Sequence, residues 1–403
     1  MGSSSAPDGR PPAIVIALDC ITGLQTTRLL AARGVPVIGI AADRGHYCAR
    51  TRIPQRIIAA PTAGEGLIEA LERLAPRLAG PAVLIPCSDA AVLTLSRWRE
   101  RLPEAYRFVL PEHGIVERLM DKVGFAEYAT EHGLPIPATR ILRSRADAIA
   151  AAASIPYPAV MKPGLKTVDW TSATKAKAFR VADGDEVLAI WDRWSAAAGN
   201  VLIAQSWIEG DAPAVSANAY IDRTGSTRVM FTARKLRQWP PETGTSSLGD
   251  EVRDDEVADV ARRLFEGAGY RGLAYLEMKR GPDGVALIVE PNIGRPTGRS
   301  AIVEQGGVEL LLSAYRDALG EPLPPNTTQT YGGARWIYWR HDLQAALLEI
   351  LARRLSPMAW WRSVREPAWE AVFDRRDARP FAADLLQTAA TAGRAVVRRL
   401  GRG

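Results

Sequence analysis

GLAYLEMKRGPDGVALIVEPNIGRPTGR, the stretch from Gly272 to Arg299, decides the fold of this chain. Residues 273–279 form a run bounded by glycine, and they end at the strong turn signal Gly281-Pro282-Asp283-Gly284. The residues that follow, 285–289, are almost all apolar and favour a β-strand. Together these signals predict a hairpin of two antiparallel strands.

Three oxygen-bearing side chains are expected on one face of this hairpin. With the turn centred on Pro282-Asp283, residue 277 pairs with residue 288. Because side chains alternate along a strand, Glu290 and Asn292 share the face of residue 288, and Glu277 joins them there. Carboxylate and amide oxygens suit Mg²⁺, which proteins hold with a few carboxylates plus substrate phosphates. The alternative is a solvated hairpin whose acids align by chance.

The composition is that of an ordinary globular protein. The chain has 403 residues, enough for two or three domains, and 24% of them are charged. No apolar run approaches the roughly 20 residues of a membrane helix, and the start of the chain lacks the apolar core of a signal peptide. Three scattered cysteines favour a reducing compartment, so we expect a cytoplasmic protein. The net charge of +6 is spread out, which an anionic small molecule explains without nucleic acid.

The beginning of the chain alternates strands and helices. The apolar run at 13–18, the helix expected at 24–33 and the strand at 35–40 make a βαβ unit, which predicts a doubly wound α/β domain. This unit lacks the G-x-G-x-x-G pattern, which argues against a dinucleotide site. Ser88 and Asp89 follow a strand, where such sheets bind ligands, but capping of the next helix is the simpler interpretation.

The hairpin motif also resembles a known family. E-x-K, a hairpin and then E-x-N-x-x-R are similar to the metal-binding core of the ATP-grasp ligases, over roughly Pro12 to Gly320. The resemblance points to the carboxylate–amine ligase branch, which includes D-aspartate ligase. The chain departs from the family in the run EPNIGRPTGR, where a shorter E-x-N-x-R is commoner, and in the segment after residue 330.

The resemblance implies an α/β fold in four parts. The first is a doubly wound N-terminal (pre-ATP-grasp) domain. The second and third are the two lobes of an ATP-grasp α+β domain, of which the first lobe carries linking helices. The fourth is a helical C-terminal extension. The expected boundaries are 12–113, 114–200, 201–322 and 323–403.

The resemblance also implies a nucleotide site. Lys122 and Lys162 would reach the phosphates, although a lone lysine such as Lys122 is by default a solvated one. The segment VLIAQSWIEG would hold the adenine and ribose; the alternative is a plain strand with its tryptophan in the core. Its expected contacts are Gln205, Ser206, Trp207, Ile208 and Asp211, with Glu commoner in the family at position 205. A Gly-, Thr- and Lys-rich segment before it could cover the phosphates, through one or more of Lys166, Lys175 and Lys177.

Several arginines are candidates for the chemistry. Arg237 is the first choice to steady the transferred phosphoryl group or an acyl phosphate, with Arg234 and Lys235 as second choices or as parts of a solvated edge. Arg295 would contact a phosphate or the substrate carboxylate. Arg299 is expected to cap the helix that begins near Ser300.

The function implied is ATP-dependent ligation. ATP and Mg²⁺, with Mn²⁺ as a substitute, would convert a small carboxylate into an acyl phosphate, which an amine then attacks; an amino acid is an expected substrate and a homodimer an expected state. The metal ligands would be Glu277, Glu290 and Asn292. A small-molecule kinase, a nucleotide-binding regulator without chemistry, and a binding module for membranes or nucleic acid remain as alternatives.

The C-terminal segment has a different composition. Residues 331–403 hold five of the eleven tryptophans, and the helix expected at 381–400 carries Arg394, Arg398 and Arg399. This helix could touch anionic lipid or a partner. The simpler interpretation is a helix docked on the protein with its arginines in water.

Overall fold

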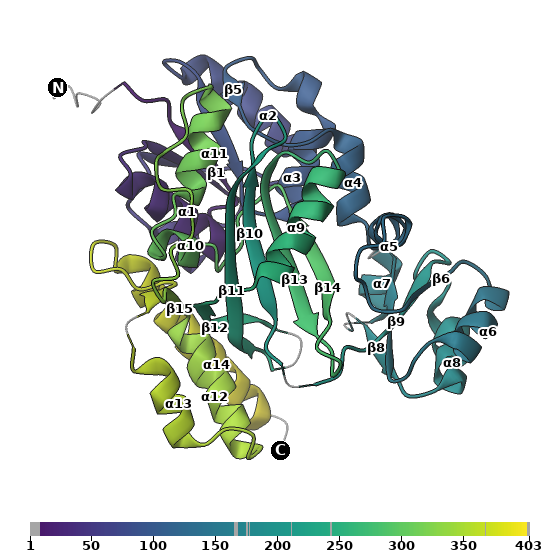
Figure 1. The fold of residues 1–403 in the computed structure, drawn as a ribbon. Helices are drawn as coiled ribbons and strands as arrows, with labels where there is room; N and C mark the ends of the chain where they lie inside the picture. Colours follow the sequence, from purple (N-terminus) through teal and green to yellow (C-terminus); the bar gives the residue numbers. More distant parts are fainter. Residues whose placement is uncertain are drawn as a thin grey trace.

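The computed structural model describes residues 9–164, 168–174, 176, 178–210, 212–241, 244–366 and 368–400, with the backbone alone for residues 168, 171 and 390–400. The described residues form three sheets, which Figure 1 shows in sequence colours. The α/β fold class expected from the sequence is confirmed, including the doubly wound first part.

The first sheet is five-stranded and parallel, in the order β3-β2-β1-β4-β5. Its central strands are fully buried, as their continuous apolar sequence predicts. The short, half-exposed strand β3 (RIIA) was not foreseen because its apolar run is only a few residues long. The elements are β1 (Ala13–Ile16), α1 (Ile21–Ala32), β2 (Val37–Ala41), η1 (Tyr47–Arg50), β3 (Arg56–Ala59), α2 (Gly64–Leu74), η2 (Ala75–Arg77), β4 (Ala82–Pro86), α3 (Asp89–Arg97), η3 (Arg99–Arg101) and β5 (Tyr106–Arg107).

A small lobe follows, with a four-stranded antiparallel sheet in the order β6-β9-β7-β8. Two helices, α6 and α8, pack together on it, and α4 and α5 link it to the first sheet (Figure 1). The elements are α4 (His113–Met120), α5 (Lys122–Glu131), β6 (Thr139–Leu142), α6 (Arg145–Ser154), β7 (Ala159–Pro163), α7 (Val168–Ala173), β8 (Phe179–Val181), α8 (Gly184–Trp194) and β9 (Leu202–Ser206).

The third sheet has seven strands, in the order β14-β13-β10-β11-β12-β15-β16. Helix α9 packs on one side of it, and α10 and α11 lie between it and α1 of the first sheet (Figure 1). The elements up to the extension are β10 (Val215–Ile221), β11 (Thr227–Trp239), β12 (Thr245–Glu251), α9 (Asp255–Gly267), β13 (Gly272–Arg280), β14 (Ala286–Ile293), α10 (Ala301–Gln305) and α11 (Leu310–Leu319).

The hairpin β13–β14 forms where the sequence predicts it, but with a different register. Met278 pairs with Ile288 and Glu277 pairs with Glu290, so Val289 is an extra residue without a partner on β13. The expected pairing of residue 277 with residue 288 is therefore wrong. This β-bulge turns Val289 outward, where it is 39% exposed, and brings Glu290 directly opposite Glu277.

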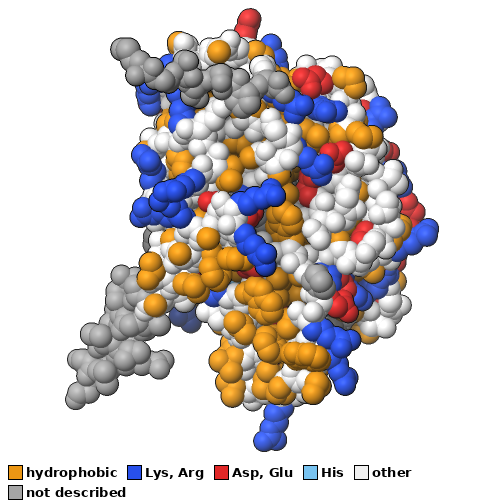
Figure 2. Space-filling view, turned by 90° about the vertical axis from the view of Figure 1, so that its left-hand side faces the viewer, with side chains coloured by type: hydrophobic (Ala, Val, Ile, Leu, Met, Phe, Trp, Pro, Cys, Tyr) orange, Lys and Arg blue, Asp and Glu red, His pale blue; other side chains and the backbone are white. Residues whose placement is uncertain are grey.

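The C-terminal extension is helical, as expected, and it also adds two strands to the edge of the seven-stranded sheet. β15 pairs with β12, and β16 pairs with β15. Figure 2 shows hydrophobic side chains gathered at the lower end of the molecule, where the extension lies. None of the described helices combines the length and apolarity that crossing a bilayer requires. The elements are β15 (Arg335–Ile337), α12 (Trp339–Leu351), α13 (Pro357–Val364), β16 (Trp369–Glu370) and α14 (Arg379–Leu400).

Two buried ion pairs attach the extension to the rest of the protein. Arg28 of α1 meets Asp377 at 3.0 Å, with both side chains at most 5% exposed. Arg237 of β11 meets Asp342 of α12 at 2.8 Å. Because an unpaired charge at either place would be costly, these pairs require the extension to stay packed on both sheets.

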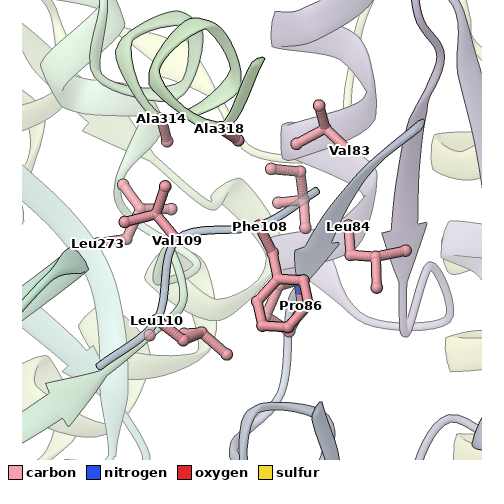
Figure 3. A pocket seen from close by; sticks show the side chains of 11 residues that line it. Val83, Leu84, Pro86, Phe108, Val109, Leu110, Leu273, Ala314 and Ala318 are labelled. Carbon is pink, nitrogen blue, oxygen red and sulfur yellow. The ribbon is translucent and has the colours of Figure 1, made fainter. Parts of the chain in front are cut away.

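The first sheet and the seven-stranded sheet share one apolar interface. A cavity of about 20 Å³ remains inside it, lined by apolar groups that include Val83, Phe108, Leu273 and Ala314 (Figure 3). All the side chains drawn there are hydrocarbon, so this hollow is a packing gap between the two sheets with no groups for catalysis.

Candidate functional site

Two carboxylates face each other on the hairpin. Glu277 and Glu290 are cross-strand partners, and the next pair on the same face is Tyr275 with Asn292. Lys235 of β11, two strands away from β13, donates from Nζ to Glu277 Oε1 at 2.6 Å, and the Tyr275 hydroxyl lies 3.2 Å from Glu277 Oε2. The hairpin thus brings Glu277, Glu290 and Asn292 together, as the sequence predicts. It does so by pairing Glu277 with Glu290, which the sequence did not predict.

The electrostatics of this face favour a cation. Partial dehydration, and then the nearby Glu277, raise the pKa of Glu290, although its side chain is solvent-exposed. Like charges directly opposite each other in a sheet are destabilising, and Lys235 relieves only part of this. No group of three or more His, Cys, Asp or Glu side chains in the described part of the chain could hold a metal. Two carboxylates and one amide fit a Mg²⁺ ion that takes its remaining ligands from phosphates and water.

Arg295 connects this face to helix α3 of the first domain. Its Nη2 donates to Asn292 Oδ1 at 2.7 Å, and its Nε donates to Asp89 Oδ1 at 2.5 Å. Ser88 is the N-cap of α3, as the simpler interpretation held, with its hydroxyl accepting from the Ala91 amide at 3.2 Å. Arg295 therefore orients the Asn292 amide by donating to its oxygen. The positive charge of Arg295 can also attract an anion at the site.

Arg299 lies beneath the same face and does not cap a helix, contrary to the expectation. It is 4% exposed, and its Nη2 donates to Ser216 Oγ and to the Tyr275 hydroxyl, both at 2.8 Å. Burial raises the pKa of Tyr275 to about 12, so its hydroxyl keeps a proton for Glu277. Sequence reasoning missed Tyr275 and Ser216 because nothing in a strand pattern distinguishes them from ordinary core residues.

The small lobe contributes a dehydrated lysine. Lys162 of β7 donates from Nζ to Gln205 Oε1 at 2.9 Å, and Gln205 in turn donates to Thr139 Oγ1 at 3.0 Å. Burial and then the positive charge of Lys122 lower the pKa of Lys162 to about 8, while Glu290 acts in the opposite direction. Lys122 and Glu290 therefore both lie within electrostatic range of Lys162, although the three residues come from a helix and two different sheets.

The predicted adenine segment lines a hollow between the lobes. Ser206, Trp207 and Ile208 border it on one side and the turn 281–283 on the other, and its volume is about 380 Å³. Trp207 is half-buried, not a core residue, with Arg180 5.3 Å above its ring. Lys279 donates to the Ile208 carbonyl at 2.9 Å. The other predicted contacts, Asp211, Lys166, Lys175 and Lys177, lie outside the described residues.

Arg237, the first choice for the catalytic arginine, does not join this group. Its guanidinium binds both oxygens of Asp342, at 2.8 and 3.0 Å, and also Ser363 Oγ at 2.9 Å. Register shifts in β11 between Lys235 and Gln238 change which side of the sheet each side chain faces. Of the three basic candidates, Lys235 lies at the carboxylates, and Arg234 pairs with Asp250 at 2.7 Å.

Comparison with solved structures identifies the fold. N5-carboxyaminoimidazole synthetase from Staphylococcus aureus superposes with a TM-score of 0.62 over 81% of each chain, at 12% identity. The biotin carboxylase domain of 2-oxoglutarate carboxylase from Hydrogenobacter thermophilus, a dimer in complex with MgADP and bicarbonate, gives 0.62 over 81% of this chain and 73% of that one, at 14% identity. The chain has the ATP-grasp fold.

The sequence comparison agrees with this ATP-grasp assignment. D-aspartate ligase from Enterococcus faecium (strain Aus0004) is 27% identical over 265 residues, which are 62% of this chain and 61% of that protein. The chain thus spans less than two thirds of the length of this curated relative. No family model matches the chain. Within this fold, Lys162 of the small lobe and Glu290 of the seven-stranded sheet influence each other electrostatically.

Proposed function

We propose that this protein is an ATP-dependent carboxylate–amine ligase that forms an amide or peptide bond through an acyl phosphate and releases ADP and phosphate. One observation carries the proposal: dehydrated Lys162 is within electrostatic range of Lys122 and of Glu290, and Glu290 is the cross-strand partner of Glu277. Cations on one lobe and metal-binding oxygens on the other are the two parts that a triphosphate and its Mg²⁺ need.

The residues take the following roles in this proposal. Lys122 and Lys162 bind the phosphates, and Glu277, Glu290 and Asn292 hold Mg²⁺, for which Mn²⁺ can substitute. The bound metal would neutralise charge on the phosphates and align the reacting groups. Ser206, Trp207 and Ile208 border the adenine; the Ile208 amide has no hydrogen-bond partner among the described residues and can donate to the ring. Gln205 orients Lys162 as well as facing the nucleotide.

The chemistry requires no nucleophile from the protein. An oxygen of the substrate carboxylate forms a bond to the γ-phosphorus of ATP, and the bond from that phosphorus to the ADP oxygen breaks. The amine then attacks the acyl carbon, phosphate leaves, and the amine loses a proton. Arg295 and Lys235 supply positive charge beside these steps, in place of Arg237.

The comparisons support the choice of substrates. D-aspartate ligase is the curated relative, so a small carboxylate and an amine, one of them an amino acid, are the proposed substrates. The carboxylase domain in complex with MgADP and bicarbonate has the same fold around a nucleotide and a small oxyanion. That domain is a dimer, and we propose a homodimer here too. The proposed compartment is the cytoplasm.

The test measures ADP release against a panel of amino acids and small carboxylates, alone and in pairs. Wild-type protein should release ADP only with a matching acid and amine, and Glu290→Gln should lower that rate by about 100-fold or more. Glu290 is solvent-exposed, so the variant should fold normally, and Glu131→Gln on the exposed face of α5 serves as the matched control. Retained turnover in Glu290→Gln would contradict the metal assignment. A stable phosphorylated acid would indicate a kinase, and ATP binding without turnover a regulator.

A further inference from the structure

The extension carries an apolar face that nothing in the described structure covers. Leu343, Leu347 and Leu351 follow one another at intervals of four along α12, and they are 49%, 59% and 70% exposed. Residues four apart lie on one side of a helix, so these leucines form a continuous stripe. Isolated exposed leucines are ordinary, but a contiguous exposed apolar patch is a sign of a binding surface.

Helix α13 continues this face. It follows α12 after a short turn, and Trp360 of α13 donates to Asp342 of α12 at 3.0 Å, which holds the two helices together as a hairpin. Its outer residues Met358 and Trp361 are 57% and 52% exposed. Figure 2 shows hydrophobic side chains over this end of the molecule, with Lys and Arg side chains beside them. We call the set Leu343, Leu347, Leu348, Leu351, Met358 and Trp361 the hairpin face.

Positive charge surrounds the hairpin face. Arg353, Arg362 and Arg365 are exposed, and no carboxylate pairs with them within the described ranges. Arg365 lies 5.6 Å above the ring of Trp361. The acids of the hairpin are already used, since Asp342 binds Arg237, Glu349 binds Arg354 and Glu366 binds Arg335.

The hairpin itself is net positive. Residues 339–366, which include α12 and α13, contain five arginines and three Asp or Glu residues, which is a net charge of +2. A docking partner for this region should be negatively charged and should accept hydrocarbon side chains.

These two requirements separate the candidate partners. A second copy of the chain would bring two surfaces of the same positive sign together, which is unfavourable. Nucleic acid would neutralise the arginines but would leave the leucine stripe in contact with phosphates and water. An anionic lipid surface satisfies both, because leucines and methionine enter the acyl boundary, tryptophan prefers the interface, and arginines reach the phosphates.

We propose that the α12–α13 hairpin docks this protein on anionic lipid membranes. Docking is peripheral, at the depth of the headgroups, and it needs no rearrangement because Arg237 and Trp360 already hold the hairpin on the protein through Asp342. The inference is independent of the proposed ligase activity, since it uses no residue of the interlobe site.

Flotation of the full chain with vesicles tests this inference. The vesicles consist of phosphatidylcholine alone or of phosphatidylcholine mixed with phosphatidylglycerol. The protein should float with the mixed vesicles, sink with the neutral ones, and be released by high salt. The double variants Leu347→Asp/Leu351→Asp and Arg362→Glu/Arg365→Glu should each reduce binding by about tenfold or more. Ile149→Asp, at a residue 50% exposed on the small lobe, and Arg77→Glu on the first domain are the matched controls and should bind normally.

Circular dichroism and ADP release should be unchanged in all four variants, because the substituted side chains are exposed and lie away from the interlobe hollow. Equal binding by wild type and the leucine variant would overturn the proposal. So would a wild-type dimer, seen by light scattering, that the leucine variant converts to a monomer, because the hairpin face would then join two copies. Binding to DNA that the arginine variant loses and the leucine variant keeps, without flotation, would overturn it as well.

Discussion

Arg237 of the seven-stranded sheet clasps Asp342 of helix α12 with two hydrogen bonds, 2.8 Å from Nε to Oδ1 and 3.0 Å from Nη2 to Oδ2. Asp342 is fully buried and also accepts from the Trp360 indole at 3.0 Å. The pair lies where the extension meets the sheet, so its energy is part of the stability of the whole molecule.

Arg237→Met should destabilise the protein by about 3–5 kcal/mol, because it leaves the buried Asp342 carboxylate without its cation. Chemical denaturation of the purified chain measures this free energy of unfolding. Arg253→Met is the control: its pair with Asp255 is 68% and 69% exposed, and its loss should cost less than about 1 kcal/mol. Equal costs for the two substitutions would show that Arg237 is not anchored as described.

The catalytic efficiency of the proposed ligation should fall at high pH because Lys162 loses its proton. With a pKa near 8, its ammonium is mostly protonated below that pH and mostly neutral above it. Because a neutral amine attracts phosphate weakly, kcat/KM for ATP should fall above pH 8, approaching tenfold per pH unit. Lys162→Arg, which stays protonated, should flatten this profile whatever its absolute rate. A wild-type profile that stays level to pH 10 would remove Lys162 from phosphate binding.

Lys235→Met should make the protein more dependent on divalent cations. Without the ammonium, Glu277 faces Glu290 with no cation beside it, so the metal-free protein should unfold at a lower temperature. Mg²⁺ should then raise the unfolding temperature by more in the variant than in wild type, since binding to the native state stabilises it. Thermal unfolding with and without MgCl₂ provides the measurement. An identical Mg²⁺ effect in both proteins would place the metal elsewhere.

Gly294→Ala should disturb the end of β14, the strand that carries the proposed metal ligands Glu290 and Asn292. Gly294 has φ +72°, and an added Cβ would lie 2.6 Å from side-chain atoms of Val92 and Leu110. Gly307, with φ +81° and open space around its Cβ position, isolates the backbone effect. Gly307→Ala should cost about 1 kcal/mol, and Gly294→Ala about 1–3 kcal/mol more from overpacking. Denaturant titration measures the free energy of unfolding of the two variants. An equal loss of stability would mean that Val92 and Leu110 move aside at no cost.

The sequence predicts the α/β class, the doubly wound first part and the group of Glu277, Glu290 and Asn292. It does so because glycine and proline turns, apolar runs and strand alternation are local signals. The register of the hairpin could not be predicted, because a bulge at Val289 adds one residue that no propensity marks. The position of Arg237 could not be predicted for a different reason: its partner lies 105 residues further along the chain, and only the packing of α12 brings the two together. The roles given to the other site residues remain predictions.

The two strands that the C-terminal segment adds to the large sheet have a practical consequence for anyone who shortens this protein. Ending the chain at the family-like boundary near residue 322 would remove β15 and leave the backbone of Leu248–Asp250 without hydrogen-bond partners along that side. A bare strand edge of this kind recruits other chains. A trimmed gene product would thus tend to precipitate, and its inactivity would say nothing about the nucleotide chemistry.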